Sequence, residues 1–197
     1  MADLGLKKER PKRKRKPAPE FSSVCDLPPG RKLQIDATRF ELKQGIAWKY
    51  LVQDVASRAC LAIHTVRSLS QEAASAALLE AEQVLRKQGI TEPLVIQSDG
   101  GSDFTSHYFQ DMCLSLGASW HRCRVSEKGG MGILERLNRT LKWDFVFWHE
   151  VDTFEDLQKL DSEFKDWYNQ QRIHSAINYQ TPWQKLLDDV KLSYSVG

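Results

Sequence analysis

The sequence lacks any long hydrophobic run. Its longest apolar stretches, such as 94–96 and 145–148, fall far short of the roughly 20 apolar residues that a membrane-spanning helix requires. No apolar segment follows the basic N-terminus, so no secretory signal is visible. These absences favour a soluble intracellular protein that has no membrane partner.

Cysteine is scarce and shows no metal-binding spacing. Cys25, Cys60, Cys113 and Cys123 form no C-x-x-C pair, and buried single thiols are ordinary in apolar segments. His121 and Cys123 are two residues apart, but no second ligand pair with finger-like spacing accompanies them. The sequence therefore predicts no zinc site, and it contains no internal repeat.

Positive charge is concentrated at the N-terminus. Residues 1–16 carry eight Lys or Arg and two acids, a net charge of +6, whereas the whole chain carries +2, which leaves −4 for residues 17–197. Such a run suits phosphate backbones or a nuclear import receptor. We predict DNA contacts here, a solvated tail being the alternative. The run contains Lys12, Arg13, Lys14, Arg15 and Lys16.

Length and patterning predict one domain with short appendages. A chain of 197 residues with 41% hydrophobic residues can bury a single core. We expect a disordered basic arm and linker at 1–27, a folded core at 28–190 and a tail at 191–197.

Hydrophobic periodicity predicts an α/β fold. The segment "RKLQIDAT" reads as a strand that ends near Asp36, and two β-rich runs follow, split by a turn around Ser57. A buried strand is expected just before Asp99, and a further one at "ASWHRCRV". Helices are expected at about 70–89, 105–116, 133–150, 153–170 and 182–190, with Ser70 and Thr153 as candidate starts and Gly89 and Gly117 as stops. A glycine-bearing loop is expected at 126–132. This order is typical of a mixed sheet with helices on both faces.

The helix expected at 133–150 carries an acid at the edge of its buried face. At about 100° per residue, one face holds Leu134, Leu137, Leu141, Phe145 and Trp148. A neighbouring face holds Glu135, Asn138, Arg139 and Lys142. Glu135 is therefore expected where the buried face meets solvent.

Three acids are predicted to converge. Asp36 and Asp99 are expected at strand ends, and groups at strand ends beside a reversal of strand order meet in one crevice. Two carboxylates in one pocket repel each other unless a cation neutralises them. Mg²⁺ suits such a site because it prefers oxygen ligands. Glu135 would complete a site for two Mg²⁺ ions about 3.5 to 4 Å apart, which clamp the attacking and leaving oxygens of a phosphodiester; Mn²⁺ is the alternative ion.

The acids and their surroundings resemble those of DDE transposases and retroviral-type integrases. There are 35 residues between Asp99 and Glu135. The segment "SDGGSDF" is similar to the family's S-D-x-G-S-E-F, and "ERLNRTLKWDF" is similar to its E-x-x-N-x-x-L-K-x-E helix. "YNQQRIHSAINYQTP" is similar to its Y-N-x-x-R-x-H-x-x-x-x-x-x-T-P ending. These matches span 31–184, and transposases of bacterial insertion sequences are the nearest in kind.

The resemblance implies an RNase H-like fold, a mixed five-stranded sheet flanked by helices, with the catalytic core at 28–190. It implies DNA transposition or integration by metal-dependent cleavage and strand transfer, with Asp36, Asp99 and Glu135 as catalytic metal ligands. Arg139 and Lys142 follow Glu135 by one and two helical turns. We expect them to neutralise DNA phosphates, a surface ion pair being the alternative.

Other acids and motif residues receive supporting roles. Asp54 in "VQDVASR" is expected to be structural, since relatives often show D-x-x-S-R there without a catalytic role. Asp103 stands where relatives usually carry Glu and is expected in a glycine turn that lets the backbone approach DNA. Gly100 replaces a residue that is often Asn. The residues expected to secure the fold or flank DNA are Tyr168, Asn169, Arg172 and His174.

Two further interpretations stay open. An RNase H-type or junction nuclease on the same scaffold would cut DNA without joining it, and a truncated or domesticated relative would bind DNA without moving it. Because no helix-turn-helix or zinc-binding module is visible, we expect a separate protein or a lost upstream segment to recognise the DNA ends. Transposases of this type usually act as multimers. The expected location is the bacterial cytoplasm, at the nucleoid, or the nucleus of a eukaryotic host, where "KRKRK" would serve as an import signal.

Overall fold

The structure, a computed structural model, describes residues 27–91, 94–123 and 130–194, with side chains up to residue 188. The strands are β1 (Lys32–Leu42), β2 (Gly45–Asp54), β3 (Cys60–Val66), β4 (Val95–Ser98) and β5 (Ser119–Arg122). The α-helices are α1 (Gln71–Lys87), α2 (Ser102–Thr105), α3 (His107–Ser115), α4 (Gly132–Arg139), α5 (Phe154–Gln170) and α6 (Pro182–Tyr194). The predicted basic run at 12–16 and most of the predicted loop at 126–132 lie outside the described residues, and the predicted domain boundaries stay predictions.

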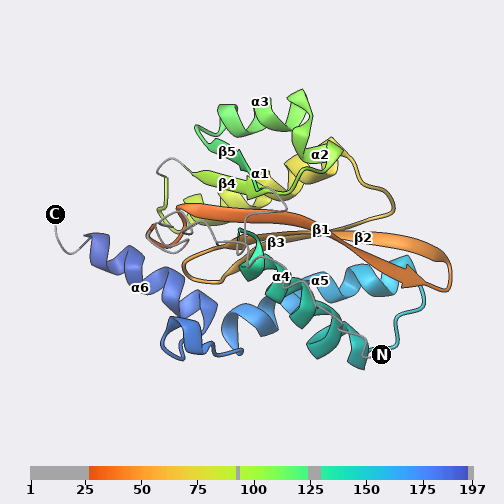
Figure 1. Cartoon of the computed structure of the whole chain (residues 1–197). Coiled ribbons are helices and arrows are strands. Elements are labelled where there is room, and N and C mark those ends of the chain that lie inside the picture. Colours follow the sequence, from red (N-terminus) through yellow and green to blue (C-terminus); the bar gives the residue numbers. More distant parts are fainter. Residues whose placement is uncertain (1–26, 92–93, 124–129, 195–197) are drawn as a thin grey trace, which may run out of the picture.

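The five strands form one mixed sheet in the order β3-β2-β1-β4-β5. β1, β2 and β3 pair as an antiparallel meander, whereas β4 runs parallel to both β1 and β5. Figure 1 shows α1, α2 and α3 on one side of this sheet and α4 and α5 on the other. The predicted mixed five-stranded sheet flanked by helices is confirmed.

The central strands are buried on both faces. In β2, Tyr50 and Val52 belong to the apolar cluster shared with α1, whereas Leu51 belongs to the cluster shared with α4 and α5. Alternate residues of a strand point to opposite faces, so one strand serves both clusters. None of the helices in the described ranges is long and apolar enough to cross a membrane.

β1 is longer than its sequence pattern predicts. The expected end near Asp36 is wrong, because the strand continues to Leu42 and pairs with β2 through a hairpin. Its far half is stabilised by Phe40, which packs in the cluster beneath the sheet. β4 pairs only with 32–34 of β1, Gln34 lying opposite Gln97. Continued by two residues, the same register would put Asp36 level with Asp99, just beyond the last pair of the parallel ladder.

The helix predicted at 133–150 changes its hydrogen bonding midway. α4 is followed by a π-helical turn, η1 (Thr140–Phe145), and a 3-10 turn, η2 (Val146–Trp148). Leu134, Leu137 and Leu141 are buried as predicted, but Trp148 is 77% exposed. The wider π turn shifts the residues that follow it around the axis, so the predicted placement of Trp148 on the buried face is wrong.

The other helices begin at the predicted caps. Ser70 caps α1, and Thr153 caps α5 in a capping box with Asp156. The helix predicted at 105–116 exists as α3, which begins at His107 because the Ser106 hydroxyl accepts the Phe109 N–H; the short α2 before it was not predicted. α6 extends to Tyr194, four residues beyond the predicted end.

Candidate active site

Asp36 and Asp99 are presented by the neighbouring parallel strands β1 and β4. Asp36 is half-buried within β1, and Asp99 is exposed directly after β4. The Asp99 Oδ1 accepts the Gly101 N–H at 2.9 Å, a local bond typical of an Asx turn. This turn carries the chain away from the sheet toward α2.

Two amide side chains hold α4 against β1. Gln34, fully buried two residues before Asp36, accepts the Leu134 N–H through Oε1 at 3.1 Å and donates through Nε2 to the Gly130 carbonyl. The Leu134 N–H is one of the first-turn donors that have no partner inside a helix. Gln34 therefore fixes where α4 begins relative to β1.

Asn138 adds the second tie. Its Nδ2 donates to Asp36 Oδ2 at 2.9 Å, and Glu135 lies one turn earlier on the same helix. Glu135 is exposed, between the buried Leu134 and the outward-facing Arg136. The edge of the sheet thus brings the three predicted carboxylates into one neighbourhood.

The pKa of Asp36 reflects the nearby charges of Asp99 and Glu135. The pKa of Asp36 is raised to about 6, mainly by burial and to a smaller extent by the negative charges of Asp99 and Glu135, while the Ala37 N–H and Asn138 oppose that rise. Both neighbours are therefore close enough to act on Asp36. Burial lowers the pKa of Lys142, and the charge of Asp36 partly offsets that effect, so Lys142 lies within reach of the same carboxylate.

The residues at this edge fit a hard divalent cation. Carboxylate oxygens are the ligands that Mg²⁺ prefers, and a cation would relieve the repulsion between them. The Asn138 Oδ1 is buried and has no hydrogen-bond partner among the described residues. Within those residues, no three His, Cys, Asp or Glu side chains already stand close enough to hold a metal ion. The carboxylates would therefore have to draw together around it.

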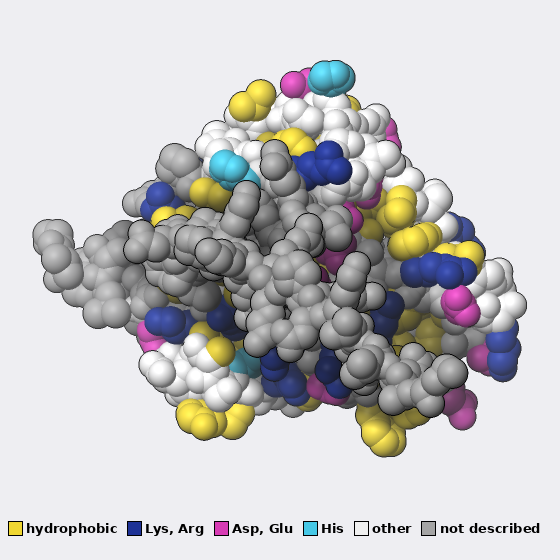
Figure 2. Space-filling view, viewed as in Figure 1, with side chains coloured by type: hydrophobic (Ala, Val, Ile, Leu, Met, Phe, Trp, Pro, Cys, Tyr) yellow, Lys and Arg dark blue, Asp and Glu magenta, His cyan; other side chains and the backbone are white. Residues whose placement is uncertain are grey.

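The two predicted phosphate-binding residues take different positions. Arg139 lines a cavity of about 460 Å³ together with Glu135, whereas Lys142 lies 5.3 Å from the centre of the Phe40 ring. Neither forms an ion pair with a described residue, and their contact with DNA phosphates stays a prediction. Figure 2 shows Lys and Arg side chains gathered on the lower part of the face where Figure 1 places α4.

Two other acids have structural roles. Asp54 is fully buried and accepts the Gly30 N–H at 2.8 Å and both the N–H and hydroxyl of Ser57, as predicted for a structural acid. Asp103 is buried in α2 and accepts the Tyr50 hydroxyl at 2.6 Å. It anchors α2 to β2 rather than forming part of an exposed glycine turn.

Gly100 is explained by a side chain from β5. A Cβ at this position would lie 2.2 Å from the Arg122 Nη2, so the guanidinium occupies the space that a larger residue would need. Arg122 thus lies beside the Asp99 turn. Neither Arg122 nor Gln34 was indicated by sequence reasoning; the only signal for Gln34 was a polar residue inside the apolar run "LQI".

The motif residues near the end of α5 secure the fold. The Tyr168 hydroxyl accepts from Gln53 Nε2 at 3.1 Å, and the Asn169 amide makes two hydrogen bonds of 2.8 Å to the Cys60 backbone. These contacts tie α5 to β2 and β3. The three described cysteines, Cys60, Cys113 and Cys123, are buried and form no disulfide with one another.

This sheet order, with helices on both faces, is that of an RNase H-like core. The catalytic core domain of HTLV-2 integrase, solved with magnesium in a dimeric form, matches with a TM-score of 0.60 at 22% identity, over 81% of this chain and 98% of that chain. A simian T-cell lymphotropic virus intasome, solved with a PP2A regulatory subunit, matches with a TM-score of 0.65 at 22% identity, over 81% of this chain and 55% of that chain. At these identities the likeness concerns the fold alone.

Family models place the chain more closely. The Integrase core domain model matches residues 27–128, and a second Integrase core domain model matches 116–182. The chain belongs to the integrase core domain family. The transposase for insertion sequence element IS904 of Lactococcus lactis subsp. lactis (strain IL1403) is 27% identical over 90 residues, which are 45% of this chain. The match covers 36% of the length of that relative.

Proposed function

We propose that this chain is the catalytic core of a DNA transposase or integrase in which Asp36, Asp99 and Glu135 bind divalent metal ions. The hydrogen bond between Asn138 and Asp36 carries the proposal, because it holds α4 beside β1 with Glu135 one turn away. Family membership and the similarity to the IS904 transposase support DNA as the substrate.

The chain's residues orient the site. Asn138 fixes one oxygen of Asp36, Gln34 holds the start of α4, and Lys142 adds positive charge next to Asp36. When bound, two Mg²⁺ or Mn²⁺ ions supply the positive charge that neutralises the carboxylates and polarises the scissile phosphate. The presence of magnesium in the HTLV-2 integrase core supports that choice of ion.

The reaction is a pair of phosphoryl transfers. Water attacks the phosphorus at the end of the mobile DNA, the bond from phosphorus to the 3′-oxygen breaks, and a DNA 3′-hydroxyl is released. That hydroxyl then attacks a target phosphodiester, so one P–O bond forms as another breaks. No covalent protein intermediate is needed.

DNA contacts and partners follow from the same proposal. Arg139 and Lys142 neutralise phosphates near the reacting bond, and the basic run at 12–16 contacts DNA further away. The chain works as a multimer on DNA with a separate end-recognition protein, as intasome and multimeric forms of the solved integrases suggest. It acts at the bacterial nucleoid, or in the nucleus if the host is eukaryotic.

The proposal is tested by removing single carboxylate charges. Asp99→Asn and Glu135→Gln, in the full chain with Mg²⁺, are assayed on a labelled duplex carrying the repeats that flank the coding region, with a plasmid as target. We expect losses of about 10³-fold in cleavage and joining. Asp111→Asn, an exposed acid on α3, is the matched control and should remain active.

Each outcome decides between interpretations. Full activity of either carboxylate variant removes that residue from the site. Cleavage by the native chain without any joined product supports the RNase H-type nuclease instead. DNA binding without either reaction supports a domesticated relative.

A further inference from the structure

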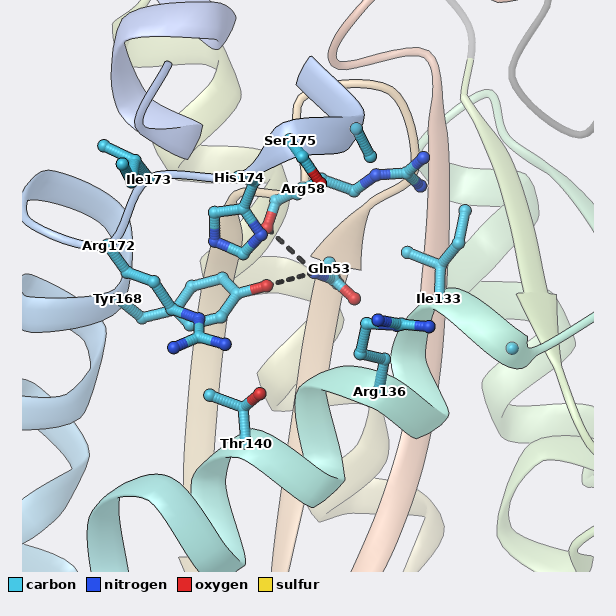
Figure 3. A pocket seen from close by; sticks show the side chains of 12 residues that line it. Gln53, Arg58, Ile133, Arg136, Thr140, Tyr168, Arg172, Ile173, His174 and Ser175 are labelled. Carbon is cyan, nitrogen blue, oxygen red and sulfur yellow. Dashed lines mark hydrogen bonds between the residues drawn. The ribbon is translucent and has the colours of Figure 1, made fainter. Parts of the chain in front are cut away.

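A separate cavity lies on the other side of α4 from Asn138. Its volume is about 460 Å³, within the range of small-ligand sites. Figure 3 shows it enclosed by α4, the end of α5, the segment after α5 and the turn that carries Arg58. Ile133 and Arg136 of α4 line it, and both lie on the side of the helix roughly opposite Asn138.

The wall of this cavity is positively charged. Arg58, Arg136 and Arg172 all line it, and no Asp or Glu is among its lining residues in the described chain. Arg172 lies 3.4 Å from Asp144, whereas Arg136 forms no ion pair with a described residue. A lining that carries arginine and no acid favours an anionic ligand.

Unpartnered buried atoms show what else the ligand must carry. Gln53 Oε1, Arg172 Nε and His174 Nε2 are buried and make no hydrogen bond with any described residue, and buried polar groups normally have partners. Gln53 is only 1% exposed, and its Nε2 already donates to the Arg58 carbonyl at 2.8 Å and to Tyr168. The Gln53 oxygen therefore calls for a donor on the ligand, while the Arg172 N–H calls for an acceptor.

The cavity also opens toward the candidate active site. The neighbouring cavity that contains Glu135 and Arg139 shares four lining residues with it, Gly132, Arg136, Thr140 and Arg172. A chain molecule could thus pass from Glu135 into this pocket along one arginine-lined surface. Ile133, Ile173 and Tyr168 add apolar area to the same wall, which suits a ring rather than a bare phosphate.

We propose that this pocket binds one unpaired nucleotide of the DNA strand that reaches Glu135, with its phosphate at Arg136 and Arg172 and its base beside Gln53 and Tyr168. The inference rests on the proposed function, since it takes DNA as the substrate. A nucleotide supplies the phosphate that the arginines require and the N–H donor that Gln53 requires. A base must leave its partner to enter such a pocket, so single strands are preferred over blunt duplex.

The test measures binding without catalysis. The full chain in EDTA is titrated with a fluorescein-labelled 12-nucleotide single strand and with the blunt duplex of the same sequence, and anisotropy is read at several salt concentrations. We expect Arg136→Gln and Ser175→Glu to weaken single-strand binding about tenfold, and Arg136→Gln to reduce the salt slope by about one. Ser175 is an exposed lining residue, so the added charge should leave the fold intact.

Two matched controls accompany these variants. Ser175→Ala keeps the site without adding charge, and Lys87→Gln removes one exposed positive charge from α1; both should bind like the native chain. Unchanged single-strand affinity in Arg136→Gln and Ser175→Glu, or no binding by the native chain, overturns the proposal. Equal losses for single strand and duplex also overturn it, because they indicate backbone contact alone.

His174 gives a local readout that does not depend on affinity. Burial and the positive charges of Arg172 and Arg58 lower the pKa of His174 to about 4, so a bound phosphate should raise its apparent pKa, measured by NMR of the imidazole. The edge of the Tyr168 ring also faces it. We expect a rise with the 12-nucleotide strand and little change with inorganic phosphate; the reverse pattern would indicate a small-anion site and contradict the proposal. Because these readouts need no joining activity, loss of the proposed function would appear as normal binding without product.

Discussion

Asp36 and Asp54 lie on neighbouring strands, and burial raises the pKa of each to about 6. Their remaining surroundings differ. Around Asp54, the Ser57 and Gly30 donors and the charge of Arg58 all lower the pKa. Around Asp36, the negative charges of Asp99 and Glu135 raise it. Both carboxylates accept hydrogen bonds, but only Asp36 also has further carboxylates close enough to raise its pKa.

The difference shows what separates a structural acid from a candidate ligand. A raised pKa alone does not distinguish them, because burial produces it at both positions. The sign of the neighbouring charges does. Asp54 has its hydrogen-bonding needs met by Gly30 and Ser57, while Asp36 belongs to a set of negative charges that a divalent cation would balance.

The largest expected effect is on catalysis. Asp36→Asn should reduce Mg²⁺-dependent cleavage and joining by about 10³-fold, equivalent to roughly 4 kcal/mol of transition-state stabilisation, because the variant loses one ligand charge. Asp54→Asn should retain activity per folded molecule. The measurement is the initial rate of joining, normalised to the folded fraction from circular dichroism. If both variants are folded and equally inactive, the distinction between Asp36 as a ligand and Asp54 as a structural acid is wrong.

The second effect is on stability, and here the Asp54 variant should lose more than the Asp36 variant. Asp54→Ala should lower the free energy of unfolding by about 3 kcal/mol, since two backbone N–H groups and the Ser57 hydroxyl lose their acceptor at roughly 1 kcal/mol each. Asp36→Ala should change it by less than about 1 kcal/mol, because relief of repulsion offsets the lost Asn138 bond. Urea unfolding compares them, and a greater loss in the Asp36 variant would contradict the comparison.

The third prediction concerns the residue that positions α4 beside Asp36. Gln34→Leu should slow joining about tenfold and cost about 1 to 2 kcal/mol of stability, because the Leu134 N–H and the Gly130 carbonyl lose their partner. Gln97→Leu removes only the 3.2 Å bond to Gln34 and is the matched control. If both variants slow joining equally at unchanged DNA affinity, Gln34 does not act through α4.

The smallest effect is a change in pH dependence. His174 has a pKa of about 4, below its usual 6.5, so its contribution to stability is present above pH 6.5 and lost as pH falls toward 4. Asp54 has a pKa above its usual 3.8, so its contribution is present below that pH and lost as pH rises toward 6. The two oppose each other between about pH 4 and 6. Arg58 acts on both groups.

Without His174, the pH dependence of stability should therefore follow the raised pKa of Asp54. His174→Gln should gain stability relative to the native chain when pH is lowered from 7.0 to 4.5, by about 1 kcal/mol. The measurement is the urea midpoint of both proteins at the two pH values. An unchanged difference between them would show that the His174 pKa is not depressed in the folded protein.

Much of the fold could be predicted because its signals are local. Strand alternation, the Ser70 and Thr153 caps and the glycine stops are short-range features, and the predicted elements exist. The errors arose where distant packing overrides local pattern. β1 continues past Asp36 because Phe40 finds a place in the core, and the π turn at Thr140 breaks the period on which the placement of Trp148 depended.

The site was less accessible to sequence reasoning. The three carboxylates were predicted from their positions at strand ends and on a helix together with the family resemblance, and their roles stay predictions. The residues that orient them could not be found, because Gln34 and Asn138 act through hydrogen bonds between segments 100 and 102 residues apart. No periodicity encodes such a pairing. Arg122 was missed for the same reason, since its position over Gly100 depends on the pairing of β5 with β4.

The tie between Gln34 and the start of α4 also bears on how the protein folds. Closing a contact between residues 100 positions apart costs chain entropy that local turns and hairpins do not pay. The β1–β3 meander can form early from neighbouring segments, whereas the third carboxylate joins the first two only after the second half of the chain has docked. A nascent or cleaved chain that ends after β5 would therefore hold a pair of acids and lack the trio, which separates folding of the sheet from assembly of the reaction centre.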